Sequence, residues 1–159
     1  MMKHVLTHMV PAVLALCLTL TACGSKDTGS TGYDPAATAQ ALLDSGAFTD
    51  TLEEVDKDTA AMLYGVEADT ITDCACYTSL SAGAEEIAVL TMADADSAKA
   101  AMDGLKARVA DQKAVLESYQ PDEVSKLDKA ILTQSGSTVV LVVAADADKA
   151  QSTLDSLNK

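Results

Sequence analysis

The chain has 159 residues, enough for one domain with a hydrophobic core, and a formal net charge of −13 from 24 acidic and 11 basic residues. Such an acidic surface repels nucleic acid and anionic headgroups, so we expect no nucleic-acid partner. Tryptophan is absent and the histidines are His4 and His8; a mature chain without these two cannot use Ser-His-Asp or Cys-His catalysis or histidine-ligated zinc.

Residues 1–22 have the parts of a secretory signal peptide: a basic tip, an apolar middle and small residues at the end. The uninterrupted apolar stretch, 9–22, is shorter than the roughly 20 residues that a membrane-spanning helix needs. The sequence LTAC at 20–23 resembles the bacterial lipobox, whose cysteine becomes the first residue after cleavage and carries a diacylglycerol. We therefore expect Cys23 to be the lipid attachment point and 23–33 to be a flexible tether.

An ordinary signal peptide followed by a coincidental cysteine, or an uncleaved anchor, are the alternatives to this interpretation. Cleavage before Cys23 would remove Lys3 and leave a mature chain with a formal charge of −14. The expected location is the extracytoplasmic face of the cell membrane, reached through the lipid. Residues 34–159 are expected to form a single α+β domain.

The first elements of that domain are predicted to be two short helices. Asp34 can cap a helix, Pro35 suits its first turn and Gly46 suits its end. The sequence TLEE at 51–54 matches a capping box, which predicts a second helix ending near Gly65.

Two strands and a long helix are expected next. Residues 71–79 (ITDCACYTS) and 86–92 (EIAVLTM) have the composition of strands, with SAGA as the turn between them. A helix is predicted over about 95–119, and Pro121 is expected to end it. One face of this helix carries a stripe at spacings of three and four, formed by Ala98, Met102, Leu105, Val109, Gln112 and Leu116.

The last third repeats this pattern, with strands expected at 130–134 and 137–144 and a final helix from about Ala147. Residues 87–105 and 139–157 are identical at seven of nineteen aligned positions, and each reads as strand, ADAD and amphipathic helix. The layout predicts two β-β-α repeats that form a mostly antiparallel four-stranded sheet with helices packed on it, preceded by the short N-terminal helices.

The two ADAD sequences are interpreted as helix caps. Aspartates at a helix start accept hydrogen bonds from free amides and favour the positive end of the helix dipole. A calcium-binding EF-hand loop would need a third acidic position, a glycine and a distant glutamate in a spacing that is missing here.

The strand around 139–143 is apolar at every position, whereas a sheet covered on one side should alternate. Its second face must therefore be covered. We expect the helices between 35 and 64 to cover it, and a second copy or another protein is the alternative.

Cys74 and Cys76 form a C-x-C pair whose side chains share one face of a strand. The two residues are ~7 Å apart, at the limit of disulfide reach. A metal site would need further ligands, and the mature chain holds no histidine. Buried small hydrophobic residues are favoured over a redox or metal site.

The chain resembles a group of small lipoproteins of Gram-positive anaerobic gut bacteria that are catalogued only as a domain of unknown function. The resemblance covers roughly 50–155, and its most telling residues are the pair Glu85-Glu86 and the sequence YQP at 119–121. Other matching segments are MLYGV (62–66), TDCACYTS (72–79), GAEEIAVL (83–90), the stretch 106–127 and STVVLVV (137–143). It implies a cell-surface lipoprotein and carries no activity, cofactor or catalytic residue; simple apolar residues would be usual in place of the two cysteines.

The function expected from the sequence is a non-enzymatic binding or interaction module, without a cofactor, metal or catalytic residue. Its partners would be the membrane, through diacylglycerol on Cys23, and a protein or envelope component. A divalent-cation-binding surface protein is one alternative, and a saturable rise in melting temperature with calcium would identify it. A hydrolase using Glu85 and Glu86 is another, disfavoured because adjacent residues of a strand point to opposite faces. Arg108 and Tyr119 are interpreted as ordinary solvated or packed helix residues.

Overall fold

The computed structural model describes residues 32–157, so the predicted signal peptide 1–22 and the predicted lipid site Cys23 lie outside the described residues. The elements in chain order are α1 (Pro35–Asp44), β1 (Leu52–Val55), α2 (Lys57–Tyr64), the 3-10 turn η1 (Ala68–Thr70), β2 (Ile71–Ser79), β3 (Glu86–Met92), α3 (Ala95–Leu116), α4 (Pro121–Leu127), β4 (Ile131–Ser135), β5 (Thr138–Val143) and α5 (Ala147–Leu157).

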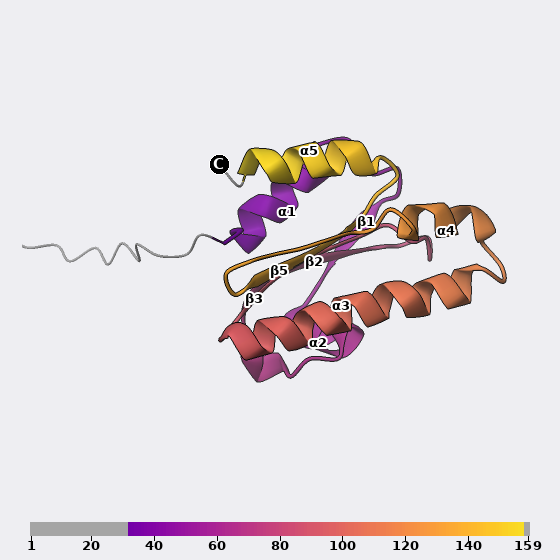
Figure 1. Ribbon diagram of the computed structural model, residues 1–159. Helices are drawn as coiled ribbons and strands as arrows, with labels where there is room; N and C mark the ends of the chain where they lie inside the picture. Colours follow the sequence, from indigo (N-terminus) through magenta and orange to yellow (C-terminus); the bar gives the residue numbers. More distant parts are fainter. Residues whose placement is uncertain (1–31, 158–159) are drawn as a thin grey trace, which may run out of the picture.

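The strands form one sheet in the order β1-β2-β3-β5-β4, with every neighbouring pair antiparallel (Figure 1). The predicted mixed α+β class with an antiparallel sheet is confirmed. The predicted number of four strands is wrong, because β1 adds a fifth strand at the edge beside β2.

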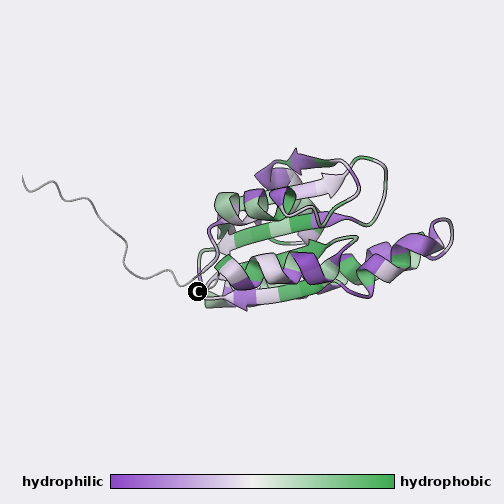
Figure 2. Ribbon diagram, turned by 90° about the horizontal axis from the view of Figure 1, so that it is seen from above, coloured by the Kyte–Doolittle hydropathy of each residue, from purple (hydrophilic) through white to green (hydrophobic). Residues whose placement is uncertain are grey.

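Helices cover both faces of this sheet: α1 and α5 lie on one side, and α2 and α3 lie on the other (Figure 1). Residues Val139–Val143 of β5 are completely buried, and their side chains alternate between two separate hydrophobic clusters. The strands at the centre are correspondingly the most apolar part of the molecule (Figure 2). The second face is covered within the chain as expected, but by α1 together with α5, since α2 packs on the opposite side.

The order β-β-α occurs twice, as β2-β3-α3 and as β4-β5-α5, but β1 and α4 lie outside this pattern, so the predicted layout of two repeats is matched only in part. The two helices pack on opposite faces, since Leu105 of α3 belongs to one cluster and Leu154 of α5 to the other. The ADAD sequences cap both helices as predicted: the Asp94 carboxylate accepts from the Ser97 amide at 2.7 Å, and that of Asp146 accepts from the Lys149 amide at 3.0 Å.

Helix α1 is confirmed with its predicted cap, because the Asp34 carboxylate accepts a hydrogen bond of 2.8 Å from the Ala37 amide. The helix predicted to begin in the TLEE sequence is wrong at its start. Residues Leu52–Val55 form a strand that pairs with β2, and the true cap is Asp56, which accepts from the Thr59 amide at 2.7 Å. Gly65 then ends α2 in the left-handed conformation, with φ of +63°.

Helix α3 ends at Leu116, earlier than the predicted residue 119, and the short helix α4 that follows was not predicted. Pro121 occupies the first turn of α4, where its missing N–H costs nothing. The proline that indicated the end of one helix therefore also begins the next.

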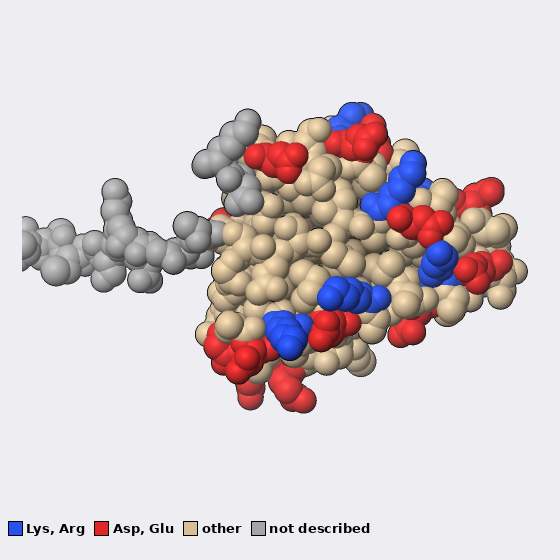
Figure 3. Space-filling model, in the orientation of Figure 1, with Lys and Arg blue, Asp and Glu red and all other residues tan. Residues whose placement is uncertain are grey.

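Acidic and basic side chains are interspersed on the face of the molecule in Figure 3, with uncharged surface between them. Within residues 32–157, no helix combines the length and the apolar character needed to cross a bilayer.

Candidate functional site

Two adjacent carboxylates, Glu85 and Glu86, are buried at the start of β3, each with 1% of its surface exposed. Isolated buried charges are very costly, so each must be paired and hydrogen-bonded to be retained. The two side chains take different partners. They therefore form two networks, each of which connects β3 to other elements.

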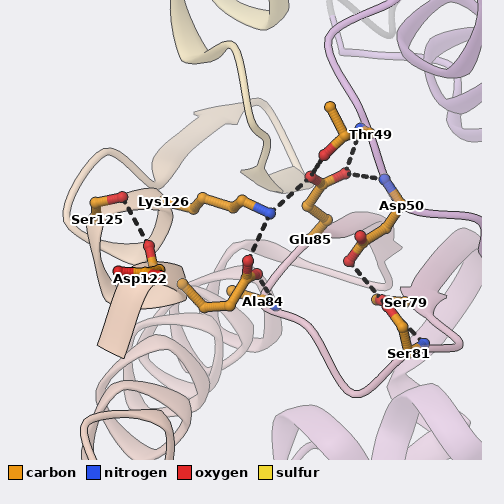
Figure 4. A network of polar contacts seen from close by, with 10 residues as sticks. Thr49, Asp50, Ser79, Ser81, Ala84, Glu85, Asp122, Ser125 and Lys126 are labelled. Carbon is orange, nitrogen blue, oxygen red and sulfur yellow. Dashed lines mark hydrogen bonds and ion pairs between the residues drawn. The ribbon is translucent and has the colours of Figure 1, made fainter. Parts of the chain in front are cut away.

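The Glu85 network joins three parts of the chain (Figure 4). One carboxylate oxygen accepts from the Thr49 and Asp50 amides at 2.9 and 3.0 Å, and the other accepts from the Thr49 hydroxyl at 2.6 Å. Lys126 of α4 donates to Glu85 at 2.9 Å and also pairs with Glu123 at 2.9 Å, while Glu123 accepts from the Ala84 amide at 2.8 Å. The network thus fastens α4 and the segment before β1 to the start of β3.

The hydrogen bonds of this network keep Glu85 and Lys126 charged. Burial alone would raise the pKa of Glu85, but the hydrogen bonds from Thr49, Asp50 and Lys126 outweigh it and lower the pKa below its ordinary value. Burial likewise opposes the charge on Lys126, and its bonds to the two glutamates nevertheless raise its pKa. Glu85 is therefore an ionised, fully engaged carboxylate, which suits a structural role better than proton transfer.

The Glu86 network lies on the α2 and α3 side. The Tyr64 hydroxyl donates to Glu86 at 2.8 Å, and the Arg108 guanidinium contacts the same carboxylate through Nε and Nη2 at 3.2 Å each. Burial and the charge of Glu86 raise the pKa of Tyr64 well above its ordinary value, so this phenol stays a donor. Arg108 is held in place by a buried partner, yet 22% of its side chain is exposed.

Arg108 reaches the wall of a groove with a volume of about 460 Å³, between α2, the C-terminal half of α3 and the turn between β2 and β3. The groove is lined by Val55, Thr59, Leu63, Thr78, Ser79, Ala82, Gly83, Glu85, Arg108, Asp111, Gln112, Val115, Leu116 and Tyr119. Most of its accessible wall is apolar, and Val115 of α3 and Tyr119, just after the end of α3, are more than half exposed. Pockets of this size and composition are typical of small-ligand sites.

Two polar groups in this groove lack complete partners. Glu86 engages Nε and Nη2 of Arg108, and Nη1 has no hydrogen-bond partner within residues 32–157. Oε1 of Gln112, one helical turn further along α3, is buried without a hydrogen-bond donor. Buried polar atoms in native proteins are nearly always satisfied, so an orphan acceptor needs an explanation. Arg108 is thus available to a bound molecule as a donor, and Gln112 lines the same groove but would have to turn its buried Oε1 outward to act as an acceptor.

The structure places the candidates from the sequence as follows. Glu85 and Glu86 enter separate networks, and Arg108 and Tyr119, interpreted as ordinary helix residues, both line the groove. The role of Gln112 was missed, although its position in an otherwise apolar stripe was a signal. Cys74 and Cys76 are free thiols, half-buried and buried respectively. In the described part of the chain, no group of three or more acidic, cysteine or histidine side chains could hold a metal ion.

Comparison with known proteins gives one match. A family model described as "Domain of unknown function (DUF4358)" matches residues 44–144, more than half of the chain. This match confirms the resemblance to a family catalogued as a domain of unknown function. No curated protein and no solved structure matches the chain.

Proposed function

The chain belongs to the family Domain of unknown function (DUF4358), and we propose that it is a non-enzymatic binding module held at the outer face of the cell membrane by a lipid on Cys23. Its ligand site is the groove between α2, α3 and the β2–β3 turn. The anchor rests on the LTAC sequence at 20–23, and the ligand site rests on the geometry of the groove.

The observation that carries the proposal is the incomplete pairing of Arg108 and Gln112 on successive turns of α3. The Arg108 guanidinium is charged, and the contacts of Nε and Nη2 with Glu86 fix its position. Its other edge is left free to pair with a ligand. A fixed guanidinium is well suited to carboxylate recognition, and it loses little freedom when it binds. The Oε1 of Gln112 is buried without a donor, and it would accept an N–H or O–H of the same ligand once the side chain turned toward the groove.

These requirements define the class of ligand: a free carboxylate, an amide N–H one helical turn away, and an apolar side chain. An amino-acid derivative or the carboxyl end of a short peptide meets all three. The apolar walls at Val55, Leu63, Val115 and Leu116 would receive its side chain. The strong negative charge of the chain disfavours polyanionic ligands.

Several observations support a binding module over a carboxylate hydrolase. Glu85 is ionised and engaged by Thr49, Asp50 and Lys126, and Glu86 is engaged by Tyr64 and Arg108. A general acid needs a raised pKa, whereas the pKa of Glu85 is lowered. Neither carboxylate is free to transfer a proton.

The ligand site is tested by calorimetry with the dipeptide acetyl-Ala-Leu and its carboxamide as probes. We expect the free acid to bind and the carboxamide to bind at least tenfold more weakly, because only the acid pairs with Arg108. Gln112→Leu should abolish most of the affinity while raising the unfolding midpoint, because it removes an unsatisfied buried acceptor. This opposite movement of affinity and stability is a signature that a purely structural residue would not give.

Two variants control this experiment. Arg108→Met should remove binding, but it leaves Glu86 buried without a cation, so its folding must be checked by circular dichroism. Lys106→Met removes an exposed charge on the same helix and should leave binding unchanged. Equal affinity for acid and carboxamide, or wild-type affinity in the folded Gln112→Leu variant, would contradict the ligand site.

The anchor is tested by intact-mass analysis of protein from membranes of the native host. We expect a chain that begins at Cys23 and carries acyl groups, whereas a Cys23→Ala variant should leave the membrane fraction. A native protein that begins at Met1, or one without acyl groups, would exclude the anchor without affecting the ligand site.

A further inference from the structure

The two cysteines of β2 occupy different environments on one face of the strand. Cys76 is completely buried, and Cys74, two residues earlier, is half-buried. Strand β1 ends at Val55, opposite Cys76, so Cys74 has no paired residue in β1. Cys74 is therefore the member of the pair with surface open to solvent, and Cys76 has none.

The spacing of the pair allows a bond between the two sulfurs. Residues i and i+2 of a strand are about 6.6 Å apart at their Cα atoms. Disulfides span Cα distances of about 4.4 to 6.8 Å, so the Cα atoms of this pair are at the upper end of the range, and the strand must bend locally to bring the Cβ atoms to the distance of about 3.5 to 4.5 Å that a disulfide needs. A bond at that end is strained, and strained disulfides are the labile ones that exchange readily.

The two thiols also differ in pKa, as a thiol that attacks first and a thiol that resolves the product should differ. The hydrogen bond between Cys76 and Cys74, aided by the positive charge of Lys57, lowers the pKa of Cys74 to about 7. Partial burial and the charges of Asp73 and Glu54 oppose this shift and do not outweigh it. The same hydrogen bond and burial raise the pKa of Cys76. Near neutral pH the accessible sulfur is therefore substantially thiolate, while the buried sulfur keeps its proton.

We propose that Cys74 and Cys76 are a redox-active dithiol, in which Cys74 reacts first with an external disulfide and Cys76 resolves the product. The Cys74 thiolate attacks one sulfur of the external disulfide, forming a mixed disulfide and releasing one thiolate, which takes a proton from solvent. The Cys76 thiol then loses its proton to solvent, and its sulfur attacks that of Cys74. This forms the Cys74–Cys76 bond and releases the second thiol. The pair loses two electrons and the external disulfide gains them.

This inference changes the interpretation favoured by the sequence, in which both cysteines were small hydrophobic residues. That interpretation predicts two inert thiols. The proposal rests instead on the difference between the two residues: Cys76 is paired with β1 and completely buried, and Cys74 is not. The dithiol is independent of the groove, because neither cysteine lines it.

The test uses the reduced full-length chain and oxidised glutathione, followed by alkylation with N-ethylmaleimide, digestion with trypsin and mass spectrometry. Residues 58–99 form one tryptic peptide that holds Cys74 and Cys76 and neither Cys17 nor Cys23. We expect a transient glutathione adduct on this peptide that gives way to a product lacking two hydrogens and carrying no alkyl group. A stable adduct, or a peptide alkylated at both cysteines after exposure to glutathione disulfide, would overturn the proposal.

Two variants assign the roles. Cys76→Ala should trap the glutathione adduct on Cys74, and Cys74→Ala should form no adduct. Alkylation of Cys74 by iodoacetamide at pH 7 should be roughly tenfold slower in Cys76→Ala, because the hydrogen bond that favours its thiolate is lost. Should either variant fail to fold, the rise and fall of the adduct in the wild-type chain still decides the question. Equal alkylation rates in wild type and a folded Cys76→Ala variant would contradict the assignment.

Discussion

Gly104 lies where α3 crosses the end of α2, and this contact requires the absence of a side chain. A Cβ added at Gly104 would overlap the backbone carbonyl oxygen of Tyr64 and would lie 3.1 Å from its carbonyl carbon. Because backbone atoms cannot rotate away as a side chain can, the approach of the two helices depends on this glycine. It also positions Tyr64, whose hydroxyl binds Glu86.

We therefore predict that Gly104→Ala destabilises the protein, although alanine is the better helix former. Helix propensity alone would favour alanine by about 1 kcal/mol, and overpacking against backbone costs up to about 3 kcal/mol, so we expect a net loss of about 2 kcal/mol. Urea unfolding measures it. Ala107→Gly, at an exposed position of α3, is the control and should lose about 1 kcal/mol from propensity alone. A stabilised Gly104→Ala variant would show that the helices can separate freely.

A second prediction concerns the pH dependence of the Glu85 network. The folded-state pKa of Glu85 is lowered from 4.5, so its contribution to stability is complete above about that pH and is lost as pH falls through the folded value. Glu85→Gln should lose about 3 kcal/mol at pH 7, because it breaks a buried ion pair. The difference from wild type should shrink between pH 4.5 and pH 2.5.

Urea midpoints measured from pH 7 to pH 2.5 test this prediction. Glu117→Gln, which removes an exposed carboxylate from the end of α3, is the control and should give a curve parallel to wild type. A constant difference between Glu85→Gln and wild type over the acid range would rule out the stabilising role assigned to the ionised carboxylate.

The candidate site shows which residues could be found in the sequence. The pair Glu85-Glu86 stood out because two charges precede an apolar strand, whereas Gln112 was counted in the apolar stripe of its helix and its role was missed. The partners of the two glutamates could not be predicted. Glu86, for example, is hydrogen-bonded to Tyr64 and Arg108, which lie 22 residues before and 22 residues after it in the chain. Such contacts depend on how helices pack on the sheet, which local patterns do not encode.

At the scale of elements, α1 and α5 act together as the cover of one sheet face. Leu42 of α1 and Leu154 of α5 are completely buried in the same cluster, with the odd-numbered residues Ile87 and Val89 of β3. Without these helices, the apolar side chains of β3 and β5 on this face would be exposed to water. Burial against α1 and α5 is thus what allows a strand to be apolar at every position.

We predict that Leu42→Ala costs about 3 kcal/mol of folding free energy, the usual range for a buried leucine being about 2–5 kcal/mol. Its neighbour Leu43 is only half-buried and serves as the matched control, with an expected loss of about 1 kcal/mol for Leu43→Ala. Thermal and urea unfolding measure both variants. Equal losses would mean that α1 does not present Leu42 to the sheet.

Elements were predictable where the local pattern and the tertiary environment agree. The strands at 86–92 and 138–143 are long apolar runs followed by helix caps, and they were predicted almost to the residue. The prediction from TLEE failed because Thr51 and Glu54 have the spacing of a capping box, whereas pairing with β2 makes Leu52–Val55 a strand with Glu53 and Glu54 exposed. Pairing with a segment more than twenty residues away overrides local propensity.

At the scale of the whole molecule, stability should be graded across the sheet. Strands β3 and β5 are central and covered on both faces, while β1 has only four residues and lies at an edge. Backbone amides of central strands open only on global unfolding, whereas those at edges open locally. The sheet order therefore predicts a pattern of hydrogen exchange.

We predict that amides of Ile87–Leu90 and Val139–Val142 exchange most slowly, and that those of Leu52–Val55 exchange at least a hundredfold faster. Hydrogen–deuterium exchange followed by mass spectrometry measures both. Equal protection of β1 and β3 would contradict the prediction that β1 is an open edge, and it is the outcome expected if another molecule covered that edge.

The direction in which α3 runs has a consequence for a tethered protein. In Figure 1, α1 begins at the left of the molecule, and α3 runs from the left to the right. The C-terminal half of α3 carries Arg108 and Gln112, and Tyr119 follows just after its end. Its 22 residues span about 33 Å. A chain moored to a bilayer by the segment before α1 would thus carry its groove at the end of the domain away from the point of attachment. Motion of the tether could not bring that end as close to the lipid as the end where α1 begins.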